Sequence, residues 1–118
     1  STTANEEALV ACLEACHECA ATCTTCADAC LRERNVQQLV NCIRMNLDCA
    51  DVCEVTGRLI ARTSEASLDV LRAQLVACRE ACSACAEECQ RHAGHHEHCR
   101  VCAEACRRCA EACDRMLA

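Results

Sequence analysis

Aromatic residues and proline are both absent from this chain of 118 residues. Without Phe, Tyr or Trp, the core lacks the largest apolar side chains, and other residues must supply their bulk. Gly occurs only at Gly57 and Gly94, so the two residue types that most often end a helix are nearly missing. These absences favour an all-α protein with few interruptions.

Excess positive charge and long apolar runs are lacking as well. The net charge of −6 argues against the basic patch that binding to nucleic acid or to an anionic membrane needs. No apolar stretch approaches the roughly 20 residues of a membrane span. The chain opens with STTANEE, which is polar and acidic and unlike a signal peptide. We therefore expect a cytoplasmic protein without nucleic-acid or membrane partners.

Cysteine dominates what is present. The stretch ACLEACHECAATCTTCADAC, residues 11–30, holds six cysteines at successive steps of 4, 3, 4, 3 and 4. Residues three and four apart share one face of a helix, and a sustained repeat of 3.5 residues keeps that face turned toward partner helices. The same steps recur in the rest of the chain. The eighteen cysteines expected to face inward are Cys12, Cys16, Cys19, Cys23, Cys26, Cys30, Cys42, Cys49, Cys53, Cys78, Cys82, Cys85, Cys89, Cys99, Cys102, Cys106, Cys109 and Cys113.

Helical periodicity covers almost the whole chain and divides it into four segments. The expected helices span about 5–32, 36–62, 67–91 and 97–117, and the turn after the second falls at Thr63 and Ser64. Asn35 is the predicted N-cap of the second helix, and Met45 is expected to fill the turn between its first two cysteines. Four helices of similar length with short links predict one domain over 1–118. Its predicted fold is an antiparallel, up-down-up-down four-helix bundle with a Cys-lined core.

Eighteen inward thiols favour metal binding over disulfides or catalysis. Bridged cysteines need Cα atoms within about 7 Å, whereas packed helix axes lie about 8–10 Å apart. A monovalent soft cation neutralises thiolates one for one, whereas Zn²⁺ prefers closed four-ligand sites. Cu(I) therefore fits best, at on the order of fifteen to twenty ions per chain by charge balance. So many equivalent ions predict a store and not an enzyme.

Two alternatives stay open. The first is a protein that detoxifies Zn or heavy metals through thiolates, which tetrahedral sites and low loading per thiol would reveal. The second is a thiol redox protein, which would show exposed thiols of low pKa and reversible disulfides.

One end of the predicted bundle is rich in histidine, which binds copper less softly than thiolate does. We interpret it as the entrance for Cu(I), formed by His92 and His96 with help from His95 or His98. The thiols expected to receive the ion there are Cys30, Cys89 and Cys99.

The opposite end holds both termini and is apolar. Met116 continues the stripe of Cys113, either as a thioether ligand or as a plug. The residues expected to seal this end are Leu9, Val10, Leu59, Ile60, Leu68, Leu71, Leu75 and Leu117.

The cysteine segments resemble the repeated pattern of the bacterial copper storage proteins, a family of Cys-rich four-helix bundles. The segments that carry the resemblance are CLEACHECAATC (12–23), CREACSACAEEC (78–89) and CRVCAEACRRCAEAC (99–113). The high cysteine count and the His-rich turn look like the cytosolic branch of that family. The resemblance implies storage of many Cu(I) ions by the eighteen cysteines, with the histidines of 92–98 as the entrance. It also implies a homotetramer. We expect the store to buffer toxic copper or to hold copper for copper enzymes, and the sequence identifies neither a donor nor an acceptor protein.

Overall fold

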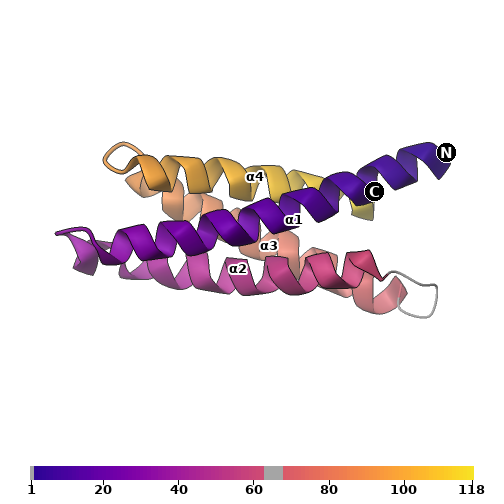
Figure 1. Ribbon diagram of the computed structural model, residues 1–118, viewed down its shortest axis with the longest axis horizontal. Coiled ribbons are helices and arrows are strands. Elements are labelled where there is room, and N and C mark those ends of the chain that lie inside the picture. Colours follow the sequence, from indigo (N-terminus) through magenta and orange to yellow (C-terminus); the bar gives the residue numbers. More distant parts are fainter. Residues whose placement is uncertain (1, 63–67) are drawn as a thin grey trace.

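Four long helices make up the computed structural model, which describes residues 2–62 and 68–118, with side chains described from residue 5 onward (Figure 1). They lie antiparallel in an elongated body of 49 × 21 × 17 Å. The helices are α1 (Thr2–Leu31), α2 (Val40–Ala61), α3 (Leu68–His92) and α4 (Glu97–Leu117), and a short 3₁₀-helix, η1 (Val36–Leu39), precedes α2. The prediction of an all-α four-helix bundle is confirmed.

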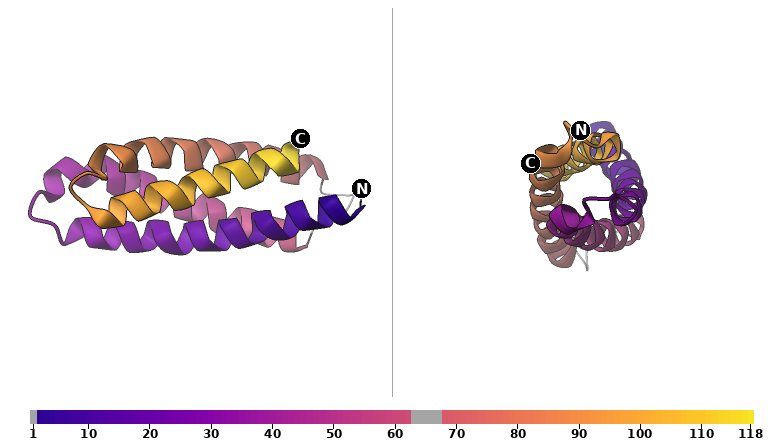
Figure 2. Two further views of the ribbon diagram at one scale, coloured as in Figure 1. Left: turned by 90° about the horizontal axis from the view of Figure 1, so that it is seen from above. Right: turned by 90° about the vertical axis from the view of Figure 1, so that its left-hand side faces the viewer.

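The helices surround a common axis, as the end-on view shows (Figure 2). Each helix packs against its neighbours in chain order, and α4 closes the ring against α1. Over the described residues, neither diagonal pair, α1 with α3 or α2 with α4, brings Cα atoms within 8 Å. The inward faces of all four helices therefore meet along the axis, where side chains fill the space between them.

The helix bounds differ slightly from those expected. Helix α1 already begins at Thr2, and the expected second helix opens with the 3₁₀ turn of η1 before α2 starts. Asn35 stands before η1, but its side chain caps no backbone N–H, and its amide donates to Oε1 of Gln38 at 3.2 Å. The expected start of the third helix at residue 67 and the turn at 63–64 lie outside the described residues.

The two ends of the bundle are closed in different ways. The link between α1 and η1 and the turn between α3 and α4 share one end, and both termini lie at the other (Figure 1). At the termini end, Ile60, Leu71 and Leu75 are buried, as expected of residues that seal it. Val10 and Leu68 are instead 49% exposed, so the prediction that they belong to this seal is wrong. Over the described residues, no helix is long and apolar enough to cross a membrane.

Candidate metal centre

All eighteen cysteines lie in the core as free thiols, and none is more than 1% exposed. They reach the axis because steps of three and four residues return to the same helix face at every turn. Alanines on the flanks of the stripes, such as Ala103, Ala105 and Ala112, are buried between the helices and let them approach closely. The interior is therefore a column of sulfur atoms supplied by all four helices.

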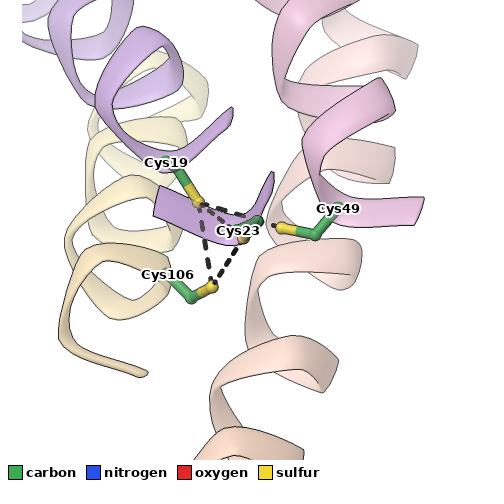
Figure 3. A group of neighbouring side chains, drawn as sticks. All are labelled: Cys19, Cys23, Cys49 and Cys106. Carbon is green, nitrogen blue, oxygen red and sulfur yellow. Dashed lines mark hydrogen bonds between the residues drawn. The ribbon is translucent and has the colours of Figure 1, made fainter. Parts of the chain in front are cut away.

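The sulfurs of this column touch one another. In the group drawn in Figure 3, Sγ of Cys19 lies 3.8 Å from each of the sulfurs of Cys23, Cys49 and Cys106. Sγ of Cys23 and Sγ of Cys106 are 3.5 Å apart. Three helices contribute to this group: α1, α2 and α4 (Figure 3).

Neighbouring groups share members with the first. Cys19 also meets Cys53, Cys82 and Cys109, and Cys23 and Cys106 also meet Cys85 and Cys102, with all ligand atoms of a group within 4.8 Å of one another. Cys109 further joins Cys16 and Cys78. Because Cys19, Cys23, Cys106 and Cys109 each belong to two of these groups, a metal ion in one group can share ligands with an ion in the next.

Asn46 is the one amide inside this column over the described residues, and it is fully buried. Its Oδ1 accepts hydrogen bonds from the thiols of Cys85 (3.1 Å), Cys89 (3.4 Å) and Cys102 (3.4 Å). The expectation that Met45 fills this turn is corrected, because Asn46 faces the axis and Met45 lies half-buried beside the core. The column thus contains one uncharged oxygen atom that could act as a metal ligand among its sulfurs.

Burial raises the pKa values of the thiols, whereas hydrogen bonds between neighbouring thiols raise some of these values and lower others. Burial raises the pKa of Cys30, because the charged thiolate loses its hydration. Hydrogen bonding with Cys106 lowers the pKa of Cys19, whereas hydrogen bonding with Cys102 raises that of Cys106. Alternating shifts of this kind are expected when neighbouring thiols share protons.

Histidine meets the sulfur column at one point, His98. Its Nδ1 lies 3.5 Å from Sγ of Cys26, 3.6 Å from Sγ of Cys99 and 3.9 Å from Sγ of Cys30. Burial acts to lower the pKa of His98, but its hydrogen bonds with Cys26 and Glu33 outweigh burial and raise it. These three cysteines and His98 form a group that could hold a metal ion.

The other three histidines of this end, His92, His95 and His96, surround this point without touching a thiol at hydrogen-bonding distance in the described structure. His92 hydrogen-bonds through Nε2 to Oε2 of Glu88 at 2.9 Å, and Glu88 is itself buried and paired with Arg91 at 3.0 Å. His96 hydrogen-bonds through Nδ1 to Glu33, and His95 is exposed. Among the expected entrance residues, His98 is therefore the one at the sulfurs.

At the termini end the column finishes in apolar and weakly polar residues. Thr56 is fully buried, donates to the carbonyl of Val52 at 2.7 Å, and accepts a hydrogen bond from the Gln74 amide at 3.1 Å. Met116 is half-buried against the core and lines two surface hollows of about 360 and 300 Å³. Its position fits a plug, and a thioether at this place could also act as a soft ligand.

Sequence reasoning assigned no role to four of the residues that shape this centre. Asn46 and Thr56 each follow the cysteine steps along α2, so the periodicity itself could have found them. Glu33 and Glu88 carry no such signal, because only the folded chain brings them to the histidines.

Comparison with known proteins gives one consistent result. Residues 5–118 match the family model described as "Copper storage protein". A cytosolic copper storage protein from Streptomyces lividans, solved with five coppers, superimposes with a TM-score of 0.94 at 51% identity, over 99% of this chain and 97% of that one. The copper storage protein of the same organism, loaded with 10 copper equivalents, superimposes with a TM-score of 0.92 at 54% identity, over 94% of this chain and 84% of that one. An uncharacterized cysteine-rich protein of Bacillus subtilis, YhjQ, is 36% identical over 90 residues, which is 76% of this chain and 78% of that one.

Proposed function

The chain belongs to the copper storage protein family, and on this basis we propose that it stores many Cu(I) ions in the interior of its bundle. The observation that carries the proposal is the sharing of sulfurs, since Cys19, Cys23 and Cys106 each take part in two possible metal groups. A bridging thiolate can hold two ions at once, so a continuous chain of shared groups suits a store better than separate single-ion sites do.

Charge explains why the ion is monovalent. A protonated thiol is neutral, and a thiolate paired with one Cu(I) is neutral as well. Burying uncompensated thiolates would cost several kcal/mol each, so loading near one ion per thiolate keeps the interior close to neutral. The relatives solved with five coppers and with 10 copper equivalents support a store that fills in steps.

Sulfur separations alone do not choose between copper and zinc. A tetrahedron with Zn–S bonds of about 2.3 Å has edges of about 3.8 Å, and many sulfurs here are already that far apart. Charge disfavours zinc, because a closed Zn–S₄ site keeps a charge of −2 that the buried interior would have to hold. A redox role is disfavoured as well, since a catalytic dithiol must be accessible and these thiols are buried.

We propose the following ligands and entrance. The ligands are the eighteen cysteines, joined by the Asn46 oxygen and, at the termini end, by the Met116 thioether. Cu(I) enters at the histidine end, where His98 hands it to Cys26, Cys30 and Cys99, and His92, His95 and His96 collect it from outside. Cys26 takes the place that was expected for Cys89, because it lies nearest to the His98 ring.

We further propose a non-enzymatic protein that works in the cytosol as a homotetramer and exchanges copper with donor and acceptor proteins. The Streptomyces relative is described as cytosolic, which supports the location. The tetramer follows from the family resemblance. It is supported by three apolar side chains on the outer surface of α2 that are each 47% exposed: Val40, Leu47 and Val55.

The test is an anaerobic titration of the reduced protein with Cu(I) against a competing chelator, with metal counted per chain. We expect tight uptake approaching one ion per thiol. Saturation at a few ions would contradict storage, and saturation at one ion per four thiols with Zn²⁺ preferred over Cu(I) would favour the zinc alternative.

A further inference from the structure

We propose that Glu33 is a positioning residue for copper uptake, because its carboxylate fixes the tautomers of two neighbouring histidines, His96 and His98. The two ring nitrogens that are left unprotonated then form two successive binding positions for Cu(I) on its way to the sulfur column. This inference rests on the proposed storage function and adds a residue that contacts no thiol.

Glu33 brings the two links of the histidine end together. It lies in the link between α1 and η1, whereas both histidines belong to the turn between α3 and α4 and the first turn of α4. One oxygen, Oε2, takes both hydrogen bonds: from Nε2 of His98 at 3.3 Å and from Nδ1 of His96. The two rings stack with centroids 5.3 Å apart and planes inclined by 29°.

A carboxylate can only accept hydrogen bonds, so the ring nitrogens that face Glu33 must carry the protons. In a neutral imidazole the other nitrogen then holds a lone pair. Glu33 therefore selects opposite tautomers: His98 is protonated at Nε2 and His96 at Nδ1. The nitrogens left to bind a metal are Nδ1 of His98 and Nε2 of His96.

Both of these nitrogens are placed for Cu(I). Nδ1 of His98 faces the sulfurs of Cys26 and Cys99 at 3.5 and 3.6 Å. Nε2 of His96 is buried and has no hydrogen-bond partner among the described residues, and its side chain is 13% exposed. Buried polar atoms are almost always satisfied, and an unpartnered nitrogen beside a metal-binding column indicates a ligand position. Imidazoles that bind metals commonly donate their second N–H to a carboxylate, as both do here.

The backbone around the histidines is already fixed, which leaves ring orientation as the variable that Glu33 controls. The amides of His95 and His96 both donate to the carbonyl of His92, at 3.1 and 3.0 Å. The carbonyl of His96 in turn accepts from Cys99 at 3.1 Å, in the first turn of α4. The negative charge of Glu33 also balances the positive charge of an ion bound to either ring.

The experiment compares the Glu33→Ala variant with two other variants. Glu33→Gln retains an acceptor oxygen and removes the charge. Glu97→Ala is the matched control, since Glu97 is a carboxylate of the same region that pairs with Arg100 at 2.6 Å. Three quantities are measured on the reduced proteins: ring-nitrogen ¹⁵N shifts without metal, the rate at which the first ions transfer from a Cu(I)–chelator complex, and total capacity.

We expect Glu33→Ala to lose the fixed tautomers and to slow the first transfer by about 10- to 100-fold at unchanged capacity, the same factor by which removing such a partner usually lowers metal affinity or activity. Glu33→Gln should keep the tautomers and most of the rate, and Glu97→Ala should match the parent. An unchanged rate in Glu33→Ala, or an equal loss in Glu97→Ala, would overturn the inference.

The parent protein alone provides a second test, independent of how the variants fold. Mixed tautomers, or tautomers opposite to those assigned, would overturn the inference without any substitution. A parent protein that shows the assigned tautomers but holds only a few ions would instead refute storage and leave the geometry of Glu33 standing.

Discussion

Filling the interior with Cu(I) should release close to one proton for each ion bound. An ordinary thiol has a pKa of about 8.5, and burial raises it, so most of the eighteen thiols are protonated at pH 7 before the metal arrives. A ligating thiol must give up its proton. Charge balance pairs one thiolate with each Cu(I), which sets the upper limit near one proton per ion.

The lower limit on the number of protons released per ion comes from thiols that are already ionised before the metal binds. Hydrogen bonding with neighbouring thiols lowers the pKa of seven of them, to about 4 for Cys12 and about 7 for Cys109. If all seven were thiolates, the other eleven would release their protons, and the ratio at full loading would be about 0.6. Zinc at four thiolates per ion would release about 2.5 to 4 protons per ion under the same limits.

The assay is a pH-stat titration of the reduced protein in unbuffered solution at pH 7, without oxygen, in which the added base is compared with the metal bound. A ratio between about 0.6 and 1 agrees with one thiolate per Cu(I). A ratio near zero would mean that the thiols are not the ligands, and a ratio above about 2 would refute charge balance as the rule that chooses the ion. Because protons compete with the metal, the affinity should also weaken by up to tenfold for each pH unit below 7.

Three further predictions concern single side chains. Ile60→Ala should cost about 2–5 kcal/mol of unfolding free energy in urea, because the side chain is 1% exposed, whereas Val70→Ala at 58% exposure should stay within about 0.5 kcal/mol; equal effects would contradict the apolar seal. Asn46→Leu should leave metal-free stability within about 1.5 kcal/mol but lower the copper count by about one ion, and an unchanged count would show that the amide is no ligand. His98→Ala should slow uptake at unchanged capacity, with exposed His17→Ala as control, and equal rates in both would exclude His98 from the entrance.

The cysteine pattern predicted most of the interior because its signal is purely geometric. Every cysteine of the 3.5-residue stripes is buried, as the repeat requires. The same geometry should have chosen Asn46 over Met45. Counting through Asn46 keeps the alternation 4, 3, 4 from Cys42 to Cys53, whereas counting through Met45 gives 3, 4, 4 and drifts off the face. The polarity of Asn46 argued against a core position in the sequence. The structure shows that its amide oxygen is satisfied there, because it accepts hydrogen bonds from three thiols.

The sequence predicted that one end of the bundle is rich in histidine, but not which histidine ring reaches the thiols. Helical spacing orders side chains along a face but says little about a turn, where backbone geometry decides which ring points inward. His98 reaches the thiols because it lies in the first turn of α4, one residue before Cys99. Its partner Glu33 is 65 residues away in the chain, and no local pattern links the two. At the termini end, Val10 is exposed because it lies two residues from Cys12, off the inward stripe of α1. Leu68 continues the stripe of Leu71 but is the first residue of α3, where the bundle ends, and it is exposed as well.

The arrangement of thiols explains how one interior can serve both as a core and as a reservoir. Without metal, each buried cysteine is a small apolar side chain in contact with others, so the bundle has a packed core although it contains no aromatic residue. With copper, each lost proton is replaced by one positive ion, and the interior keeps nearly the same net charge. Groups that share sulfurs place possible metal positions next to one another along the axis. A divalent ion would leave an uncompensated charge at each closed site, and the cost of burying that charge would rise with every site filled. Capacity in this fold is therefore set by how many thiols the helices can place on the axis, and the uninterrupted 3.5-residue repeat is the sequence feature that maximises that number.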